Sequence, residues 1–456
     1  MSRILFVLYA EKTHLFIQVP LARAFAAAGH EVRVASQPEL VPEITRAGLT
    51  AVPVGRDHGM GRLLALRPEF RSRFGGSDLP PFDVADVPGE LLSLGYLRAG
   101  YADVVPWWFR LVNEPLVDEL VGLCRWWEPD LVVWEPGTFA GAVAARACGA
   151  AHGRLTWGVD FFGRVREQFV RLAAAESAAG GSSGGSGGVP GGDPLGEWLG
   201  ELAGRYGVGF DEELTTGQFT ADLLPAPFRF ETSIDYVPVR YGTYNGVSVV
   251  PRWLWEAPVR PRVGFTLGLS AVERLAGYSV SVVEILKALA GLDVEVVAAL
   301  SGAEGVRAEL EGSGVGADRV RVEEFVPLAA LAPTCAVMVH HGGFGTIGTT
   351  SLHAVPQLAL AEQLDAIWLA RGVTSYGAGT DLRVAEATGE RVAHEVRRML
   401  TETSYAEGAR RLRADMLAMP APAEAVPHLL HLAERHRRPP TANPYRAPNT
   451  RRKATT

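Results

Sequence analysis

The chain has 456 residues, which is too long for one ordinary hydrophobic core and suits two domains. Hydrophobic residues make up 47% of the sequence and charged residues 21%, as in globular proteins, and a net charge of −7 gives no support for nucleic-acid binding. The three cysteines, Cys124, Cys148 and Cys335, are too few and too far apart to predict a disulfide framework or a metal site. No run approaches the roughly 18 apolar residues of a membrane span, so we expect a cytoplasmic protein.

The first predicted element is a buried parallel strand over residues 4–8, where five apolar residues follow one another. A turn over residues 9–15 leads to a helical pattern that Gly29 ends, and a second strand follows at residues 31–35. His14 therefore lies beyond the carboxyl end of the first strand, where open α/β sheets bind their ligands. A loop histidine is most often only solvated, but an imidazole at this point could also act as a base at neutral pH.

The adjacent tryptophans Trp107 and Trp108 belong to an aromatic cluster in a stretch that several prolines interrupt. They could pack in a core or a lid, or they could form an apolar wall for a flat acceptor molecule. Both interpretations stay open on the sequence alone.

A further buried strand is predicted over residues 130–134, and Glu135 stands at its carboxyl end. Its carboxylate could accept a hydrogen bond from His14 and favour the imidazolium form. It could equally serve as an N-cap-type residue for the predicted helix over residues 139–148. The sequence does not decide between these two roles.

Two segments have the composition of connections rather than of packed elements. Residues 173–192 are rich in Gly, Ser and Ala, so we expect a flexible, disordered loop inside the first domain. Glycine and proline cluster again at residues 241–261, which fits a boundary between two domains.

The second half repeats the α/β rhythm and leads to a glycine-rich turn. Its predicted strands cover residues 262–267, 294–300, 320–322 and 336–339. A helix is expected to begin near Thr346, and without Cβ atoms on Gly343 and Gly345 a phosphate can approach its N–H groups. One of the paired histidines His340 and His341 would be a good electrostatic partner for that phosphate. A small turn at residues 268–270, with Gly268 and Ser270, could touch the phosphates from the other side.

Two other interpretations of this turn must be weighed. Gly343, Gly345 and Gly348 match the dinucleotide-binding fingerprint, and Glu362 lies about twenty residues on, where an NAD-binding acid would be expected. That fingerprint belongs on the first strand–helix turn of its domain, whereas about three predicted strands precede it here. NAD binding also leaves the paired histidines unexplained, and a purely structural tight turn would need neither of them.

Several motifs along the chain resemble the nucleotide-sugar glycosyltransferases of the GT-B fold, particularly the bacterial antibiotic branch that attaches deoxysugars to macrolides and anthracyclines. The motifs are Thr13-His14, residues 129–136, Tyr244-Asn245-Gly246, Phe325-Val326-Pro327, His340-His341-Gly342-Gly343 and Asp365. They cover nearly all of the chain before its tail. The resemblance implies an α/β protein with two Rossmann-like, doubly wound parallel-sheet domains that face a central cleft.

The resemblance also implies a division of the chain and a set of roles. The expected parts are an acceptor-binding domain (1–240) containing the loop 173–192, a linker (241–261), a nucleotide-sugar-binding domain (262–419), a C-terminal helix that crosses back (420–437) and a disordered tail (438–456). His14 is implied as the general base with Glu135 in support. The nucleotide diphosphate is implied to contact Phe325, Val326, His341, Gly343, Gly345 and Thr346, and the donor sugar to contact Asp365 and Glu362.

The function expected from this resemblance is an inverting transfer of a deoxysugar, often an aminosugar, from a TDP-sugar to a hydroxyl of a polyketide-type product. Leu328 replaces a glutamine of plant relatives, which leaves the nucleotide base open, with thymidine favoured. Ala366 stands where relatives often have glutamine, as a donor with fewer hydroxyls would permit. No Asp-x-Asp occurs in the chain, so we expect no metal and no other cofactor.

Three further expectations complete the functional prediction. Some members of the resembled branch need a haem-lacking, cytochrome-like auxiliary protein, which is a candidate partner. An NAD(P)-dependent or other nucleotide-binding enzyme is the main alternative function. A non-catalytic binding protein is the third class.

Overall fold

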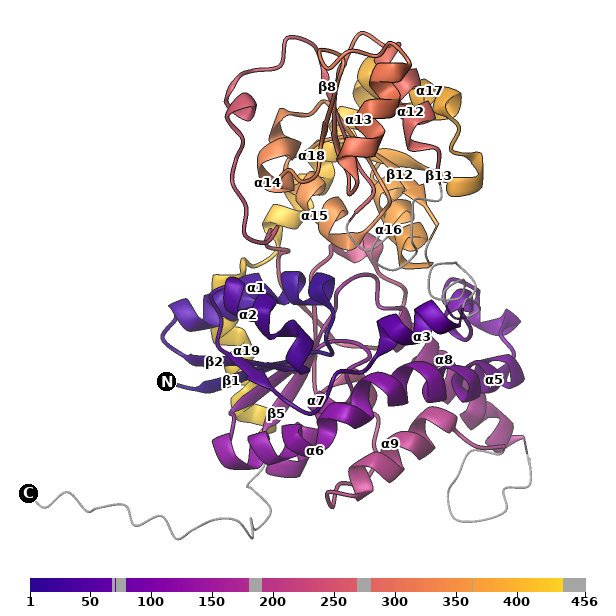
Figure 1. The fold of residues 1–456 in the computed structure, drawn as a ribbon. Coiled ribbons are helices and arrows are strands. Elements are labelled where there is room, and N and C mark those ends of the chain that lie inside the picture. The colour runs from indigo at the N-terminus through magenta and orange to yellow at the C-terminus, as the bar shows by residue number, and fades with distance from the viewer. Residues whose placement is uncertain (68–69, 71–78, 180–190, 269–279, 363, 438–456) are drawn as a thin grey trace, which may run out of the picture.

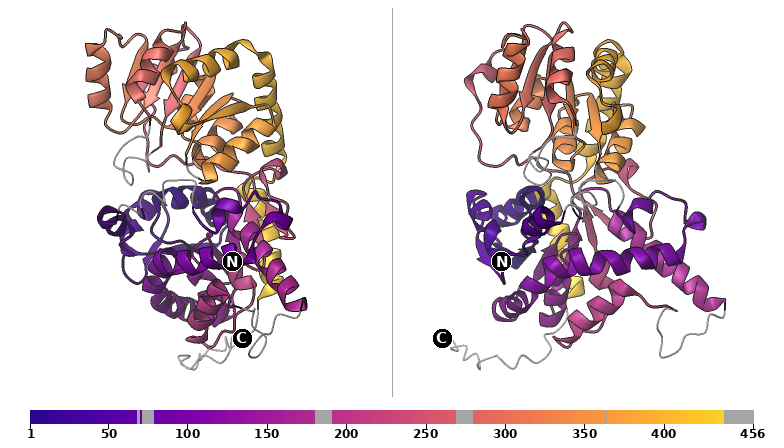
Figure 2. Two further views of the ribbon diagram at one scale, coloured as in Figure 1. Left: turned by 90° about the vertical axis from the view of Figure 1, so that its right-hand side faces the viewer. Right: turned by 45° about the vertical axis from the view of Figure 1, so that its right-hand side comes forward.

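The computed structural model describes the whole chain except residues 68–69, 71–78, 180–190, 269–279, 363 and 438–456. Two parallel sheets organise it, one in each lobe of the molecule (Figure 1). Each sheet is covered by helices on both faces, as the two further views in Figure 2 show. The predicted fold class, two doubly wound α/β halves, is confirmed.

The first sheet has seven strands in the order β3-β2-β1-β4-β5-β6-β7, all paired in parallel. Their central members are continuous apolar runs that are buried, as strands covered on both faces must be. The strands are β1 (Arg3–Val7), β2 (Glu31–Ser36), β3 (Ala51–Pro53), β4 (Leu131–Trp134), β5 (Ala151–Leu155), β6 (Thr220–Asp222) and β7 (Tyr236–Pro238).

The helices of this half follow the strands as crossover connections. They are α1 (Lys12–Ala27), α2 (Val41–Arg46), α3 (Met60–Leu66), α5 (Leu94–Val104), the π-helix η4 (Val105–Phe109), α6 (Arg110–Trp127), α7 (Ala140–Cys148), α8 (Phe161–Ala178), α9 (Pro194–Gly204) and α10 (Glu213–Thr216). Short 3-10 turns occur at Pro38–Leu40, Phe82–Val84, Gly89–Leu91, η5 (Ala226–Phe228) and η6 (Arg252–Trp255).

The second sheet has six parallel strands in the order β10-β9-β8-β11-β12-β13. The strands are β8 (Arg262–Thr266), β9 (Glu295–Ala299), β10 (Val320–Glu323), β11 (Val337–His340), β12 (Gln357–Ala361) and β13 (Gly379–Arg383). The helices are α12 (Val282–Ala290), α13 (Ala303–Gly312), α14 (Leu328–Leu331), α15 (Phe344–Leu352), α16 (Leu364–Ser375), α17 (Gly389–Thr401), α18 (Thr403–Ala418) and α19 (Pro422–His436), with 3-10 turns at Ala332–Thr334 and Val384–Glu386.

Both sheets reverse their strand order once, and at equivalent places. The reversal falls between β1 and β4 in the first sheet and between β8 and β11 in the second. At such a reversal the connections that follow the two strands diverge to opposite faces, which opens a crevice at their carboxyl ends. The segments after β1, β4, β8 and β11 are therefore the places where ligand-binding side chains are expected.

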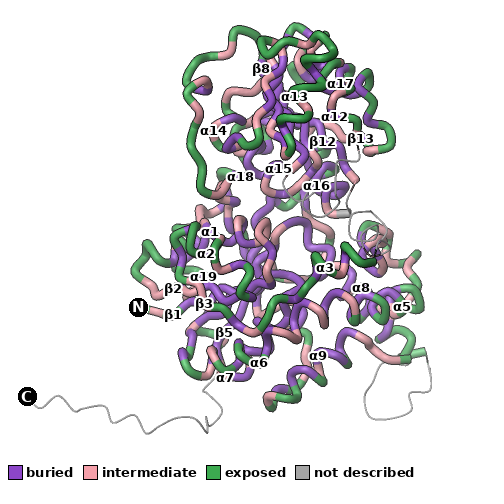
Figure 3. The backbone as a smooth tube through the Cα atoms, in the orientation of Figure 1, coloured by how far each residue is buried: buried purple, intermediate pink, exposed green. Residues whose placement is uncertain are grey.

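The hydrophobic core of the first half extends into the second half. The main cluster of buried side chains begins at the first sheet and includes residues of α15, α16, α18 and α19. A second cluster fills the space around the second sheet. The last described helix, α19, packs against α1 and β5, so the chain returns to the first half after the second sheet (Figure 1). Figure 3 shows that buried backbone is concentrated in the strands and the helices between the sheets.

Most predicted strands agree with the structure within two residues, but two expectations are wrong. The turn predicted over residues 9–15 ends sooner, because α1 begins at Lys12 and places His14 in its first turn. The start of the predicted flexible loop is helical, since α8 continues to Ala178. Residues 180–190 of that loop and the predicted tail lie outside the described residues. Among the described helices, none is long and apolar enough to cross a membrane.

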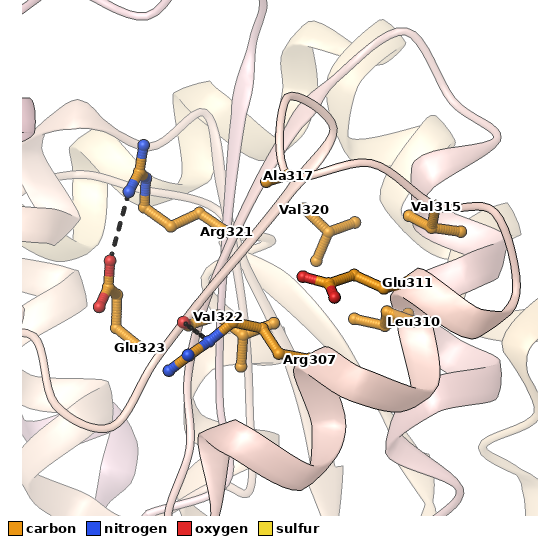
Figure 4. A pocket seen from close by; sticks show the side chains of 9 residues that line it. All are labelled: Arg307, Leu310, Glu311, Val315, Ala317, Val320, Arg321, Val322 and Glu323. Atoms are coloured by element: carbon orange, nitrogen blue, oxygen red, sulfur yellow. Dashed lines mark hydrogen bonds and ion pairs between the residues drawn. The ribbon is translucent and has the colours of Figure 1, made fainter.

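A hollow of about 280 Å³ lies between α13 and the edge strand β10 (Figure 4). Arg307 donates a hydrogen bond to the Val322 carbonyl (3.1 Å), and Arg321 pairs with Glu323 (3.3 Å) at its border. None of the predicted site residues lines it, and it lies away from the strand reversal of its sheet.

The packing of α16 against the first half predicts a stability effect at Gly372. A Cβ at this position would overlap with the Phe228 ring of η5, which is itself buried. We expect Gly372→Ala to lower the free energy of unfolding by about 1–3 kcal/mol, because an overpacked contact forces neighbours to shift. Thermal unfolding of the purified variant measures this.

Gly122→Ala is the matched control. Gly122 also lies in a helix, α6, but is exposed, and nothing lies within 4 Å of an added Cβ. Alanine should be neutral or slightly stabilising there, because it is the better helix former. Equal melting temperatures for the two variants would contradict the close packing of α16.

Candidate active site

His14 is placed at the reversal of the first sheet by the start of α1. The Glu11 side chain caps this helix by accepting hydrogen bonds from the Thr13 backbone N–H (3.1 Å) and hydroxyl (2.8 Å). The cap fixes the first helical turn directly beyond β1. His14 therefore faces the carboxyl end of the neighbouring strand β4, where Glu135 lies.

Glu135 contacts the imidazole from a fully buried position. Its Oε2 lies 3.2 Å from His14 Nδ1. The two atoms are close but not well aligned for a hydrogen bond, so the contact is mainly electrostatic. Hydrogen bonds between catalytic groups often align only when substrate is bound. The same carboxylate accepts hydrogen bonds from the Thr138 hydroxyl and from Trp157 Nε1.

The alternative role of Glu135 as a helix cap is wrong. The N-cap of α7 is Phe139, and no side chain of the cap residue bonds to the helix. The first N–H of α7, that of Ala140, donates instead to Asn113 Oδ1 (2.9 Å). The Glu135 carboxylate is thus directed at His14 and its neighbours rather than at the helix backbone.

Trp157 is a site residue that the sequence analysis missed. Its indole ring is stacked on the His14 imidazole, with ring centroids 4.5 Å apart and an interplanar angle of 17°. It follows β5, the strand next to β4, so it lies at the same carboxyl edge as Glu135. That position after a buried strand was the available signal, but a tryptophan there is more often a core residue.

His340 shapes the turn after β11 and does not face a ligand. It is fully buried, its Nε2 lies 3.0 Å from Gln357 Oε1, and its Nδ1 accepts a hydrogen bond from the Gly342 N–H (3.0 Å). Burial, with a smaller effect of His341, lowers the pKa of His340 to about 3. The imidazole is therefore neutral and has a hydrogen-bond partner at each of its two nitrogens, so its role is structural.

His341 is the member of the pair that faces the predicted diphosphate site. Its ring lies between two glycines, and a Cβ on Gly268 would come within 2.6 Å of it, while one on Gly343 would overlap with it. These glycines therefore make room for the imidazole as well as for a phosphate. Burial lowers the pKa of His341 to about 4, so the ring is neutral at neutral pH. Its Nδ1 has no hydrogen-bond partner among the described residues.

The N-terminus of α15 offers backbone donors beside His341. Gly343 is the N-cap residue of α15, and it has no side chain that could bond to the first N–H groups of the helix. The Thr346 N–H already donates to the Gly343 carbonyl (3.1 Å), so the earlier N–H groups, those of Phe344 and Gly345, are the ones left for an anion. The helix begins at Phe344, two residues before the predicted start.

Gly348 has a packing role. A Cβ there would lie 2.8 Å from the Tyr241 ring, and the Tyr241 hydroxyl donates to the Gly345 carbonyl (3.2 Å). The glycine turn follows β11, the fourth strand of its sheet in chain order, whereas a dinucleotide fingerprint follows the first. Both observations argue against the NAD interpretation.

The residues predicted to contact the nucleotide base lie after β10. Phe325 is 43% exposed, a large value for a phenylalanine, and Val326 beside it is buried. They precede α14, which packs against α15 and so belongs to the same region as the glycine turn. The linker residue Asn245 accepts a hydrogen bond from the Ala329 N–H (2.8 Å) and ties this segment to the interdomain connection. Ser270 lies outside the described residues.

Asp365 approaches the His14 site from the second half. It lies in the first turn of α16, not on β12, and Glu362 is partly buried between the two elements. Burial raises the pKa of Asp365, while the N–H groups of Ala366 and Asp365 and the charge of His14 lower it. His14, from the other half of the molecule, is thus one of the groups that act electrostatically on this carboxyl. A Cβ on Gly342 would approach Ala366 to 2.8 Å, so the glycine turn also contacts α16.

Trp107 and Trp108 lie in η4, where Trp108 has a packing role, while the acceptor role of Trp107 stays a prediction. Trp108 is 4% exposed and packs against Phe82 and Phe162, with ring centroids 6.4 and 5.8 Å apart. Trp107 is partly exposed and stacks on Trp108. Phe162 also contacts Trp157 (6.0 Å), so an aromatic chain links η4 to the His14 site. No group of three or more His, Cys, Asp or Glu side chains with metal-site geometry occurs in the described parts of the chain.

Comparison with known proteins places this arrangement in a family. The model described as "Erythromycin biosynthesis protein CIII-like, N-terminal domain" matches residues 23–268, and its C-terminal counterpart matches residues 283–432. The 10-deoxymethynolide desosaminyltransferase of Streptomyces venezuelae is 46% identical over 96% of this chain and 99% of that protein. The aklavinone 7-beta-L-rhodosaminyltransferase of Streptomyces galilaeus is 44% identical over 95% and 96%.

A solved structure shows the same architecture. The glycosyltransferase VinC in complex with dTDP is 34% identical, covers 95% of this chain and 100% of its own, and superimposes with a TM-score of 0.80. The chain belongs to the EryCIII-like glycosyltransferase family and has the GT-B fold. The resemblance noted in the sequence is thus confirmed, and the protein is a glycosyltransferase.

The two buried histidines predict an acid-sensitive fold. A free imidazole has a pKa near 6.5, whereas that of His341 is about 4 in the folded protein. Between these values the unfolded chain binds more protons, so the free energy of unfolding falls as the pH is lowered through this window, by at most about 1.4 kcal/mol per pH unit for each group. We expect urea midpoints to drop between about pH 7.5 and about pH 5, and His341→Asn to reduce that drop.

The exposed His394 of α17 provides the control, since His394→Asn should leave the pH dependence unchanged. An equal drop in wild type and His341→Asn would show that the His341 imidazole is not held neutral by the fold.

Proposed function

We propose that this chain is an inverting, metal-independent transferase that moves a deoxysugar, aminosugars included, from a TDP-sugar to a hydroxyl of a polyketide-type product. The names of its relatives support the donor and acceptor classes, because they transfer desosamine to 10-deoxymethynolide and rhodosamine to aklavinone. The dTDP in the VinC structure supports the nucleotide.

One observation supports the proposal: each of the two strand reversals is followed by one of two chemically complementary sets of groups. The first half presents the His14–Glu135 pair, and the second presents the free N–H groups of α15 with His341 and Asp365. In the proposed roles, His14 would be the base, the start of α15 with His341 would hold the leaving group, and Asp365 would contact the donor sugar. This is the arrangement that a direct displacement at a sugar carbon needs.

The proposed reaction follows from the orientation of His14. Its Nδ1 faces Glu135, which leaves Nε2 to accept the proton of the acceptor hydroxyl. The acceptor oxygen forms a bond to the anomeric carbon as the bond from that carbon to the TDP oxygen breaks. The single displacement inverts the configuration, and the Glu135 carboxylate stabilises the imidazolium that forms.

The leaving diphosphate would be stabilised mainly by backbone dipoles. The neutral His341 can donate one hydrogen bond but brings no full charge of its own. The positive end of α15 and the N–H groups of Phe344 and Gly345 supply the remaining electrostatic stabilisation. We propose that this replaces a divalent cation at the leaving group.

The donor sugar would lie against α16. Asp365 and Glu362 offer carboxylate acceptors for its hydroxyls, and the buried Ala366 offers none. Because Ala366 also contacts the Gly342 position, the floor of the sugar site is small and apolar. This favours a donor with fewer hydroxyl groups. Equal use of fully hydroxylated TDP-glucose would contradict that preference.

A haem-lacking, cytochrome-like auxiliary protein is part of the proposal as an activating partner. Its requirement would be visible as feeble turnover by the isolated chain that rises when the auxiliary protein is added. Both assays below should therefore be run with and without it.

The diphosphate site predicts selective nucleotide binding. We expect calorimetric titration in EDTA to show TDP binding, and His341→Ala to weaken it by about 10-fold or more, since a hydrogen bond to a charged group is lost. His394→Ala, on the exposed face of α17, is the control and should bind TDP as wild type does. Binding of NAD but not of TDP would contradict the proposed donor site.

The base predicts a large loss of turnover. We expect His14→Ala to lower kcat by about 100-fold or more, the usual contribution of general base catalysis, while TDP affinity is kept. Glu135→Gln should lower kcat less, because the imidazole stays in place. Activity should be full in EDTA, and the product should have the inverted anomeric configuration. Wild-type turnover of His14→Ala, or a strict metal requirement, would overturn the mechanism.

A further inference from the structure

Trp157 occupies a position for which the proposed reaction has not yet assigned a role. Its ring face lies on the His14 imidazole at 4.5 Å, and its Nε1 donates to Glu135 Oε2 at 2.8 Å. That same oxygen lies 3.2 Å from His14 Nδ1. One side chain therefore contacts both members of the base pair at once.

We propose that Trp157 is the positioning residue of the base: it orients the Glu135 carboxylate through its N–H and holds the plane of the His14 ring by stacking. The inference rests on the proposed function, because it takes His14 to be the base. It goes beyond that function because it makes a third residue responsible for the orientation of His14 and Glu135.

The carboxylate is held through both of its oxygens. Thr138 donates its hydroxyl hydrogen to Oε1, and the Thr138 oxygen in turn accepts the Tyr9 N–H (3.0 Å). Trp157 holds Oε2, the oxygen that faces the imidazole. Glu135 is fully buried, and its hydrogen bonds come from neutral donors, so among the described residues no guanidinium or ammonium group in direct contact competes with His14 for its charge. Without the indole N–H, Glu135 Oε2 would lose the hydrogen bond that holds it beside the His14 imidazole.

The stacked ring restricts His14 from one side, and Tyr9 restricts it from another with an edge contact at 5.4 Å. The parallel indole face also attracts a positively charged imidazole, because the face of an aromatic ring is negative. Trp157 can therefore favour the charged state that His14 reaches only after it accepts the proton. This selective stabilisation should appear in kcat and not in substrate affinity.

Trp157 is itself immobilised from the far side. Its ring packs edge-on against Phe161 (5.9 Å) and Phe162 (6.0 Å), which open α8. The indole is thus fixed by packing, as a residue that positions others must be. Its place after β5 puts it at the same edge as Glu135.

The test is a double-mutant cycle between Trp157 and Glu135. Trp157→Phe keeps an aromatic face but removes the N–H, and we expect kcat to fall by about 10-fold. Trp157→Leu removes both and should lower kcat by about 100-fold. In a Glu135→Gln background, Trp157→Phe should cost less than about twofold, because the uncharged amide no longer attracts the imidazolium.

Trp198→Phe is the matched control. The Trp198 indole is also buried, donates to a glutamate (Glu114 Oε1, 3.3 Å) and is stacked on an aromatic ring (Phe109), but it lies outside the site. Its kcat should stay at the wild-type value. TDP affinity and the KM of both substrates should stay within about twofold in all Trp157 variants, which also verifies that they are folded.

Three results would overturn the inference. Equal effects of Trp157→Phe in the wild-type and Glu135→Gln backgrounds would show that the indole does not act through the carboxylate. A raised acceptor KM at unchanged kcat would make Trp157 part of the acceptor site instead. Parallel loss of TDP affinity would make it a residue of general stability. The proposed function fails separately, through wild-type turnover of His14→Ala.

Discussion

The reversal of strand order in each sheet is the constraint on which the site depends. Parallel strands all present their carboxyl ends at one edge, and only where the order reverses do the following segments diverge. The chain places His14 after β1 and Glu135 after β4, and it places Gly268 after β8 and His341 after β11. All four follow strands at a reversal, so each half of the molecule contributes one crevice to the proposed site.

Helix α16 belongs to the second half and packs directly against the first half. It carries Asp365 in its first turn, while Trp368 packs against Phe161 (5.4 Å) and Phe230 (5.2 Å) of the first half. Further along, Arg371 pairs with Asp86 across the same interface. Because a helix is rigid over this length, contacts between the halves determine where Asp365 lies relative to His14. In the proposed reaction the position of the donor sugar would therefore depend on interdomain packing.

The sequence predicted those features that depend on local pattern, namely the buried strands, the glycine turn and the helix that follows it. It misplaced His14 in a turn, because the helix-starting cap of Glu11 is a side-chain contact that hydrophobic periodicity does not reveal. It could not resolve the role of Glu135, and it missed Trp157, since their contact joins segments 22 residues apart on neighbouring strands. Glycines at the turn were predicted from phosphate approach, whereas Gly343 also accommodates the His341 ring.

The charged groups of the site complement the charges that the proposed reaction would create. Both histidines of the glycine turn are neutral through burial, so the second half offers hydrogen bonds and a helix dipole rather than a fixed cation. His14 lies near two carboxylates, Glu135 within its own half and Asp365 across the interface. In the proposed reaction His14 would take the acceptor proton, and both carboxylates would stabilise the new positive charge as negative charge develops on the diphosphate. Because Asp365 lies on α16, which packs against the first half, its contribution to the proposed reaction would depend on the same interface that would position the sugar.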